Sequence, residues 1–191
     1  MNDGIAKDLC SLQYPTIDQA IGHIIKLGKG ALLAKIDIKQ AYRNIPVHPD
    51  DRHLLGMMWE NEIYIDLVLP FGLRSAPKIF TSIADAAEWI MRKQGVTWCL
   101  HYIDDFLTAG RPETEECAKN LQTTIRTCEW LGLPLKSHKI EGPTPIIPFL
   151  GIVLDTEKGE IRLPEEKMKE LTTLIKEWLN RKHCKKRALL S

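Results

Sequence analysis

The chain has 191 residues, of which 44% are hydrophobic and 27% are charged. This composition is typical of a globular protein and excludes a disordered or low-complexity chain. No apolar run approaches the ~20 residues that cross a bilayer, and the N-terminus lacks the basic-then-apolar layout of a secretory signal. The net charge of +1 neither favours nor excludes a nucleic-acid partner.

The five cysteines are scattered along the chain and form no C-x-x-C pair. Their spacing indicates neither a zinc knuckle nor a disulfide framework. We therefore expect reduced thiols in an intracellular protein with no membrane partner, and the sequence does not distinguish cytoplasm from nucleus.

The first half of the chain switches between helical and extended patterns, with Gly and Pro marking the boundaries. The expected elements are a helix over 16–27, a buried strand over 31–38, a short helical exit over 40–44, a hairpin of strands over 54–59 and 63–68, an irregular loop over 69–77, and a helix over 77–93.

The second half contains a strand–turn–strand pattern around residues 102–105, then a helix that Pro112 opens and Gly132 ends. The remaining expectations are a stiff proline-rich connector over 143–148, strands over 149–154 and 161–163, and an amphipathic helix from Pro164. Paired strands interrupted by helices predict an α+β fold, an antiparallel sheet with helices on one face.

Two adjacent carboxylates, Asp104 and Asp105, stand at the turn between two apolar strands. Adjacent carboxylates repel each other, and a buried unpaired charge is costly. A hard divalent cation such as Mg²⁺ resolves both problems because it prefers carboxylate oxygen. The alternative is an ordinary polar β-turn, in which Asp is common.

Asp37 is the candidate for a third carboxylate, because it ends a strand apolar enough to be central. If the two strands lie side by side, Asp37 comes within reach of Asp104 and Asp105. Three carboxylates can hold two Mg²⁺ (or Mn²⁺) ions ~3.5–4 Å apart, the arrangement that stabilises attacking and leaving oxygens in phosphoryl transfer.

With these residues in place, the chain resembles the palm domain of reverse transcriptases in five motifs that occur in the family's order. The matching segments are Asp37 with Tyr42, the stretch LPFGL through PKIF at 69–80, YIDD at 102–105, LGL through Lys139 at 131–139, and FLG at 149–151. The amino-acid sequence of residues 32–56 and 69–80 looks most like that of retrotransposon enzymes of the DIRS-like tyrosine-recombinase type.

The resemblance assigns roles to matched positions in the nucleotide site. Asp37, Asp104 and Asp105 would be the metal-binding catalytic residues, with the backbone carbonyl of Ile38 as a further ligand. Tyr42 would be the steric gate that excludes a ribose 2′-OH, or otherwise a core aromatic. Phe71 and Gly72 would lie along the nascent base pair, with Phe71 standing where some viral members carry Gln.

Further roles concern the primer and the leaving group. Tyr102 and Ile103 would border the primer terminus, a role compatible with ordinary strand packing. Phe149, Leu150 and Gly151 match the primer-grip region. Lys139 matches a lysine proposed to protonate pyrophosphate, and its alternative is a surface lysine.

The expected organisation is partial fingers and palm over 1–154, followed by a primer-grip and thumb-like helical segment over 155–191. The chain lacks the family's upstream fingers, so we expect a fragment of a longer retroelement polyprotein whose other parts would be RNase H, recombinase or integrase. The expected activity is RNA-directed DNA polymerisation, with dNTPs and an RNA or DNA template-primer as partners. The alternative is an inactive palm remnant that at most binds nucleic acid or a partner.

Overall fold

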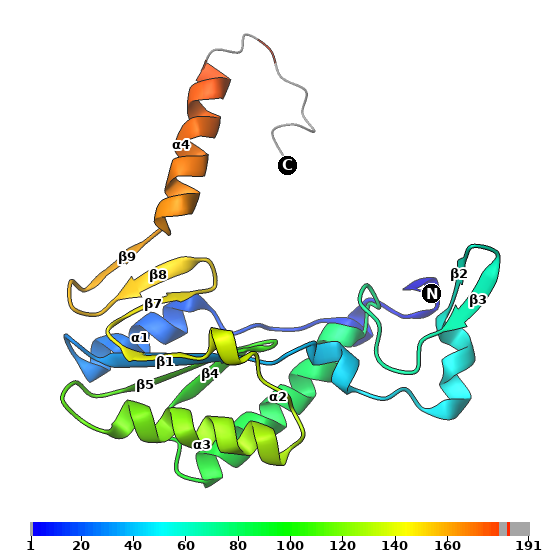
Figure 1. Ribbon diagram of the computed structural model, residues 1–191, viewed down its shortest axis with the longest axis horizontal. Helices are drawn as coiled ribbons and strands as arrows, with labels where there is room; N and C mark the ends of the chain where they lie inside the picture. The colour runs from blue at the N-terminus through cyan, green and yellow to red at the C-terminus, as the bar shows by residue number, and fades with distance from the viewer. Residues whose placement is uncertain (1, 180–182, 184–191) are drawn as a thin grey trace.

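The computed structural model describes residues 2–179 and 183, and its elements alternate between helices and short antiparallel strands (Figure 1). The helices are α1 (Ile17–Leu27), α2 (Ala76–Lys93), α3 (Glu116–Trp130) and α4 (Glu165–Leu179). The strands are β1 (Leu32–Asp37), β2 (Gly56–Trp59), β3 (Glu62–Ile65), β4 (Cys99–Tyr102), β5 (Asp105–Gly110), β6 (Glu141–Thr144), β7 (Ile146–Phe149), β8 (Ile152–Asp155) and β9 (Glu160–Arg162). Short 3-10 turns cover Asn2–Gly4, Asp8–Cys10, Ala41–Asn44, Pro49–Leu55 and Ser137–Lys139.

The central sheet has four antiparallel strands in the order β4-β5-β1-β6. Side chains alternate between its faces, so Leu33 of β1 faces one layer while Ala34 and Ile36 face the other. Both faces of β1 are buried, as its nearly continuous apolar sequence predicts.

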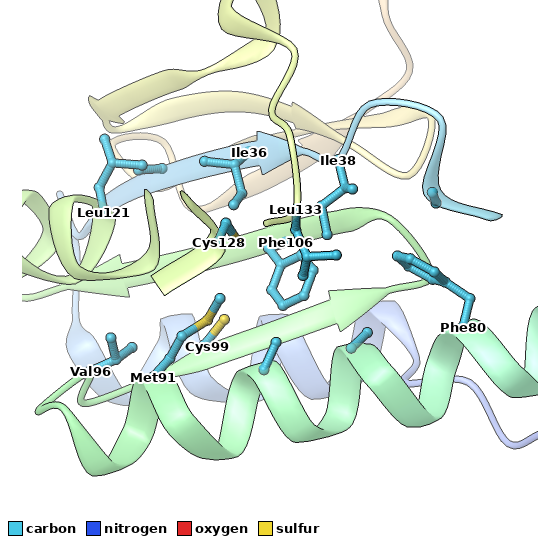
Figure 2. Close-up of a cluster of buried hydrophobic side chains, with 14 of the residues drawn as sticks. Ile36, Ile38, Phe80, Met91, Val96, Cys99, Phe106, Leu121, Cys128 and Leu133 are labelled. Carbon is cyan, nitrogen blue, oxygen red and sulfur yellow. The ribbon is translucent and has the colours of Figure 1, made fainter. Parts of the chain in front are cut away.

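Helices α2 and α3 cover one face of this sheet, which confirms the expected α+β arrangement (Figure 1). Figure 2 shows the core that they enclose, in which Phe106 of β5 lies between the sheet and the helices. Phe80 and Met91 of α2 and Cys128 of α3 are fully buried there. Each such side chain contributes about 1.5–3 kcal/mol by burial, so this layer fixes the sheet on which the site is built.

The opposite face of the sheet is covered as well, by α1 and by a second antiparallel sheet in the order β7-β8-β9. Ala20 of α1, Leu107 of β5 and Ile147 of β7 are buried in this second layer. Helix α1 has the predicted bounds because the Gln19 side chain accepts from the Thr16 backbone N–H and Gly28 ends the helix at φ 95°.

The β2–β3 hairpin turns at Glu60 and Asn61, which both have positive φ. This confirms the predicted hairpin, although its first strand begins later than expected and its second strand ends earlier, at Ile65. Leu54 and Leu55 belong to the 3-10 turn at 49–55, because Pro49 starts that turn with Asp50 donating its N–H to the His48 ring.

Two boundaries in the second half were predicted wrongly. Helix α3 begins at Glu116 instead of Pro112, because Glu113 has φ 57° and Thr114 closes a turn onto the Arg111 carbonyl. The proline-rich segment is mostly strand, since Pro143 lies in the edge strand β6 and Pro148 in the edge strand β7, where Pro is tolerated, and only Pro145 lies between them.

The strand predicted over 149–154 is in fact the β7–β8 hairpin. Phe149 pairs with Ile152, so Leu150 and Gly151 form its turn, at φ 46° and 81°. The short strand at β9 and the final helix from Glu165 are confirmed. The apolar face of α4 is half exposed, and the residues that follow it at 180–182 and 184–191 lie outside the described part of the chain.

Within the described residues, no helix has the length and apolar character needed to cross a bilayer. Cys10, Cys99, Cys117 and Cys128 are free thiols, as expected, and Cys184 lies outside the described residues. Burial raises the pKa of Cys117 and Cys128 to about 12, which keeps both thiols protonated and unreactive.

Gly110 ends β5 at the point where the backbone of α3 comes closest to the sheet. A Cβ atom at Gly110 would lie 2.3 Å from the backbone nitrogen of Cys117. We expect Gly110→Ala to lower the free energy of unfolding by about 1–3 kcal/mol, because backbone must move to make room. Urea denaturation measures the change.

Gly22→Ala in α1 is the matched control, because a Cβ atom there would meet open space. We expect this variant to gain up to ~1 kcal/mol in the free energy of unfolding. Equal losses in both variants would contradict the prediction.

Candidate active site

The β4–β5 hairpin carries the adjacent carboxylates at its tip. Tyr102 pairs with Asp105, so the turn consists of Ile103 and Asp104 alone. Ile103 has φ 55°, a left-handed conformation that is rare for a β-branched residue and costs on the order of 1–3 kcal/mol. This tight turn holds Asp104 and Asp105 half-buried at the end of the sheet.

The end of β1 meets this tip directly. Asp37 is the antiparallel partner of Asp105, and the Ile38 N–H donates to the Asp104 carbonyl over 2.9 Å. The pairing of β1 with β5 therefore brings the three predicted carboxylates together at one end of these strands. Asp37 is 4% exposed, whereas its two neighbours are half-buried.

Two lysines from the segment after α3 contact Asp37. The Nζ atom of Lys136 lies 2.5 Å from Asp37 Oδ1, and that of Lys139 lies 2.6 Å from Oδ2. Backbone contacts place this segment: the Lys136 N–H donates to the Asp37 carbonyl over 2.9 Å, and the Lys39 N–H donates to the Pro134 carbonyl over 2.7 Å.

The lysine contacts make the pKa of Asp37 shift in the opposite direction from those of Asp104 and Asp105. Burial alone would raise the pKa of Asp37, but the hydrogen bonds from Lys136 and Lys139 outweigh it and hold that pKa below its usual range. Burial raises the pKa of Asp104 and of Asp105, and the negative charge of Asp37 adds to both shifts. The hydrogen bond to Asp37 also raises the pKa of Lys139.

The donor set suits a hard divalent cation, because three carboxylates offer only oxygen ligands and two of them are destabilised by their own charge. Among residues 2–179 and 183, however, no three His, Cys, Asp or Glu side chains are close enough together to hold a metal ion as they stand. Asp37 instead binds ammonium groups, so cation binding requires its lysine partners to turn away. The metal site stays a prediction.

A cavity of about 350 Å³ lies beside Asp104, and we call it the nucleotide cavity after the role predicted for its residues. It is lined by Gln40, Ala41, Tyr42, Phe71, Ile103, Asp104 and Lys136. The Tyr42 ring packs 5.4 Å from the Phe71 ring and 5.9 Å from the Phe80 ring, measured between centroids. Tyr42 is thus held by core packing on one side while its ring also borders the cavity, so the two interpretations of this residue are compatible.

The loop that carries Phe71 and Gly72 is fixed by the N-terminal segment. The Asn2 side chain donates to the Gly72 carbonyl over 2.8 Å and accepts from the Arg74 N–H over 2.8 Å. Gly72 has φ 82°, a conformation that favours glycine. Phe71 is 67% exposed at the cavity rim.

A second cavity, of about 220 Å³, has Asp37 in its lining, and we call it the primer-grip cavity after the role predicted for residues 149–151. Its lining residues are Lys35, Asp37, Asp105, Lys139, Glu141, Pro148, Phe149, Leu150 and Gly151. The hairpin turn predicted to grip the primer therefore faces two of the three carboxylates. Lys35 ties this wall together, since its Nζ lies 3.0 Å from Glu141 Oε1 and donates to the Pro148 carbonyl over 2.8 Å.

Sequence reasoning missed Lys136, which contacts Asp37 as closely as Lys139 does. One signal was available: Lys136 and Lys139 are three residues apart, and a 3-10 turn over Ser137–Lys139 aligns side chains at that spacing. The contact with Asp37 itself depends on the long-range bridge between Ile38 and Leu135. The sequence pattern does not reveal that bridge.

Comparison with known proteins identifies the family. The family model described as "Reverse transcriptase (RNA-dependent DNA polymerase)" matches residues 5–154. Polyprotein P3 of Commelina yellow mottle virus is 30% identical over 162 residues, covering 85% of this chain and 8% of the polyprotein. The enzymatic polyprotein of Cestrum yellow leaf curling virus is 30% identical over 173 residues, covering 84% of this chain and 26% of that protein.

The Transposon Tf2-3 polyprotein of Schizosaccharomyces pombe is 26% identical over 145 residues, covering 76% of this chain and 10% of the polyprotein. The chain thus spans at most 26% of the length of these three relatives. Their names support a retroelement or viral context and do not test the DIRS-like assignment, which stays a prediction.

Solved structures share the fold. The foamy viral protease-reverse transcriptase in complex with double-stranded DNA aligns with a TM-score of 0.67 at 18% identity, covering 85% of this chain and 26% of that one. The same viral protein in complex with an RNA/DNA hybrid aligns with a TM-score of 0.67 at 19% identity, covering 84% and 20%. With the family match over most of its length, the chain belongs to the reverse transcriptase family.

Proposed function

We propose that this chain contains the catalytic centre of an RNA-directed DNA polymerase, which adds dNTPs to a primer 3′-OH on an RNA or DNA template. The observation that carries the proposal is the sheet register. It sets Asp37 opposite Asp105 and ties the Asp104 carbonyl to the strand that bears Asp37. Carboxylates on two rigid strands form a more precise site than carboxylates on loops.

Asp37, Asp104 and Asp105 would hold two Mg²⁺ or Mn²⁺ ions, with the Ile38 carbonyl as a further ligand. When bound, such ions activate the primer hydroxyl and stabilise the pyrophosphate leaving group. The raised pKa values of Asp104 and Asp105 support this role, because they reflect unfavourable negative charge that a cation would neutralise.

In the nucleotide cavity, the Tyr42 ring would occupy the space that a ribose 2′-OH needs. Its position beside Asp104 and Phe71 supports this steric role. Phe71 and Gly72 would lie along the nascent base pair, where the exposed Phe71 ring offers a flat apolar surface.

At the tip of the β4–β5 hairpin, Tyr102 and Ile103 would border the primer terminus. The Tyr102 ring is braced by the Tyr14 ring at 4.8 Å between centroids. The turn over Phe149, Leu150 and Gly151 would hold the primer, and its position on the cavity wall supports that role. Lys139 would donate a proton to the leaving group, and its position 2.6 Å from Asp37, a proposed metal ligand, supports a role close to the reacting phosphates.

The division into fingers and palm over 1–154 and a thumb-like segment over 155–191 is supported by the end of the family match at residue 154. Complexes of the foamy viral relatives with double-stranded DNA and with an RNA/DNA hybrid support a template-primer as partner. The neighbouring segments would be RNase H, recombinase or integrase; the polyprotein relatives support a place within a longer polyprotein.

Primer extension tests the proposal. On a ribo-adenylate template with an oligo-deoxythymidine primer, dTTP and Mg²⁺ or Mn²⁺, the wild-type chain is expected to extend the primer, and Asp104→Asn is expected to lose on the order of 10³-fold or more in rate. Circular dichroism of both proteins controls for folding. Failure of the folded wild type to extend the primer would favour the alternative of an inactive palm remnant, which nucleic-acid binding without extension would then identify.

A further inference from the structure

The two lysines that contact Asp37 line two separate cavities. Lys136 lines the nucleotide cavity and contacts Asp37 Oδ1. Lys139 lines the primer-grip cavity and contacts Oδ2. The two ammonium groups neutralise the same carboxylate, but they face different spaces.

The position of Lys136 is fixed by the backbone on both of its sides. Its own N–H donates to the Asp37 carbonyl, and its carbonyl accepts from the Lys139 N–H, both over 2.9 Å. Leu135, the preceding residue, forms a β-bridge with Ile38. The Cα of Lys136 is therefore anchored beside the carboxylates, while its four-carbon side chain retains free torsions.

The other residues around the nucleotide cavity suit a nucleotide but leave its phosphates without a counter-charge. Tyr42 and Phe71 supply aromatic surface, and Asp104 supplies negative charge. Lys136 is the one cationic side chain among the residues that line this cavity. A triphosphate carries several negative charges, so a site for it needs a cation that the aromatic wall does not provide.

We propose that Lys136 binds a phosphate of the incoming nucleotide, an inference that rests on the proposed function. Its side chain is 27% exposed, so the ammonium group reaches the cavity without unfolding of the segment. In the structure Lys136 is a counter-ion of Asp37. If Asp37 held a divalent cation, the Lys136 ammonium group would be free to turn toward the cavity and a phosphate there. Lys139 would also have to leave Asp37, but it does not line the nucleotide cavity.

The pair of lysines supplies a matched control. Lys136→Met and Lys139→Met each remove one ammonium group from Asp37, so any effect that acts through the charge of Asp37 is common to both variants. Loss of a phosphate contact is specific to Lys136. The measurement is the dissociation constant of dTTP in Mn²⁺, on a ribo-adenylate template with a dideoxy-terminated primer that cannot be extended.

We expect Lys136→Met and Lys136→Gln to weaken dTTP binding about 10-fold, a typical loss for one charge-assisted contact. Lys139→Met is expected to change the dissociation constant of dTTP less than ~3-fold, because its proposed proton transfer belongs to the chemical step, which the dideoxy-terminated primer blocks. Lys136→Arg is expected to restore the dissociation constant to within ~3-fold of wild type. Circular dichroism identifies any variant that does not fold, and two neutral replacements at position 136 guard against such a loss.

Equal weakening by Lys136→Met and Lys139→Met would overturn the inference, because the effect would then act through Asp37. Unchanged binding in the folded Lys136→Met protein would overturn it as well. In both cases wild-type dTTP binding leaves the proposed function standing. A folded wild-type chain that binds no dTTP would contradict the proposed function together with this inference.

Discussion

Asp105→Asn is expected to abolish nucleotidyl transfer and, in the metal-free protein, to raise the free energy of unfolding by on the order of 1 kcal/mol. Burial and the charges of Asp104 and Asp37 raise the pKa of Asp105, so its ionised form destabilises the folded chain. Asn keeps the shape of the side chain and removes the charge. Urea unfolding in the presence of a chelator measures the gain, and primer extension measures the loss.

The gain has a defined pH dependence. Because the pKa of Asp105 is raised in the folded state, the folded chain binds the proton more tightly than the unfolded chain does. Stability of the wild type is therefore lost as pH rises from the ordinary value of 3.8 through the folded pKa. The advantage of Asp105→Asn is full above that range and disappears below it, where both forms are neutral.

Asp37→Asn is the matched control. It removes a carboxylate from the same cluster, but it is expected to lower stability and not to raise it. Lys136 and Lys139 hold the pKa of Asp37 down, so its removal leaves two ammonium groups without their partner. A loss of about 1–3 kcal/mol is expected, at the lower end of the range for buried pairs because Lys139 is 49% exposed. If both Asn variants lost stability to the same extent, repulsion among the carboxylates would not exist as described.

Tyr42→Ala is expected to relax discrimination against ribonucleotides by about 10–100-fold. The Tyr42 ring fills the space beside Phe71 and Asp104, and its removal opens room for a 2′-OH group. The ratio of kcat/KM for dTTP to that for UTP measures the effect.

Tyr42→Phe separates ring size from hydrogen bonding, because it keeps the ring and loses only the hydroxyl. Discrimination is expected to stay within ~3-fold of wild type in this variant. Equal relaxation in Tyr42→Phe and Tyr42→Ala would show that the hydroxyl, and not the bulk of the ring, excludes the ribonucleotide.

Local patterns predicted the elements that carry the carboxylates. The apolar run before Asp37 is a strand buried on both faces, and the two-residue turn at Ile103 and Asp104 follows from apolar strands on either side of polar residues. The elements predicted wrongly are those in which a local signal had two meanings. Proline is common at helix starts and also in turns, and Pro112 lies in a turn. Proline also fits edge strands as well as connectors, and Pro143 and Pro148 lie in edge strands.

The candidate site was predictable in its carboxylates and only partly in their surroundings. Asp37 and Asp105 were identified from their strand ends, and the sheet register now gives their pairing. Lys136 was not identified, because its partner is set by a bridge between Ile38 and Leu135 that joins distant parts of the chain. Such contacts form only when distant parts of the chain pack together, and the hydrophobic periodicity of the sequence does not predict them.

The place of β1 in the sheet also has a consequence for synthesis of the chain. Its two neighbours, β5 and β6, are both made after it, so a strand that is buried on both faces in the folded chain leaves the ribosome with both edges unpaired. Non-local pairings of this kind form slowly, and open apolar edges recruit other strands. Nascent chains that end before residue 144 therefore lack the β6 partner, and they are expected to depend on chaperones or to aggregate, whereas chains that extend past β6 can close the sheet.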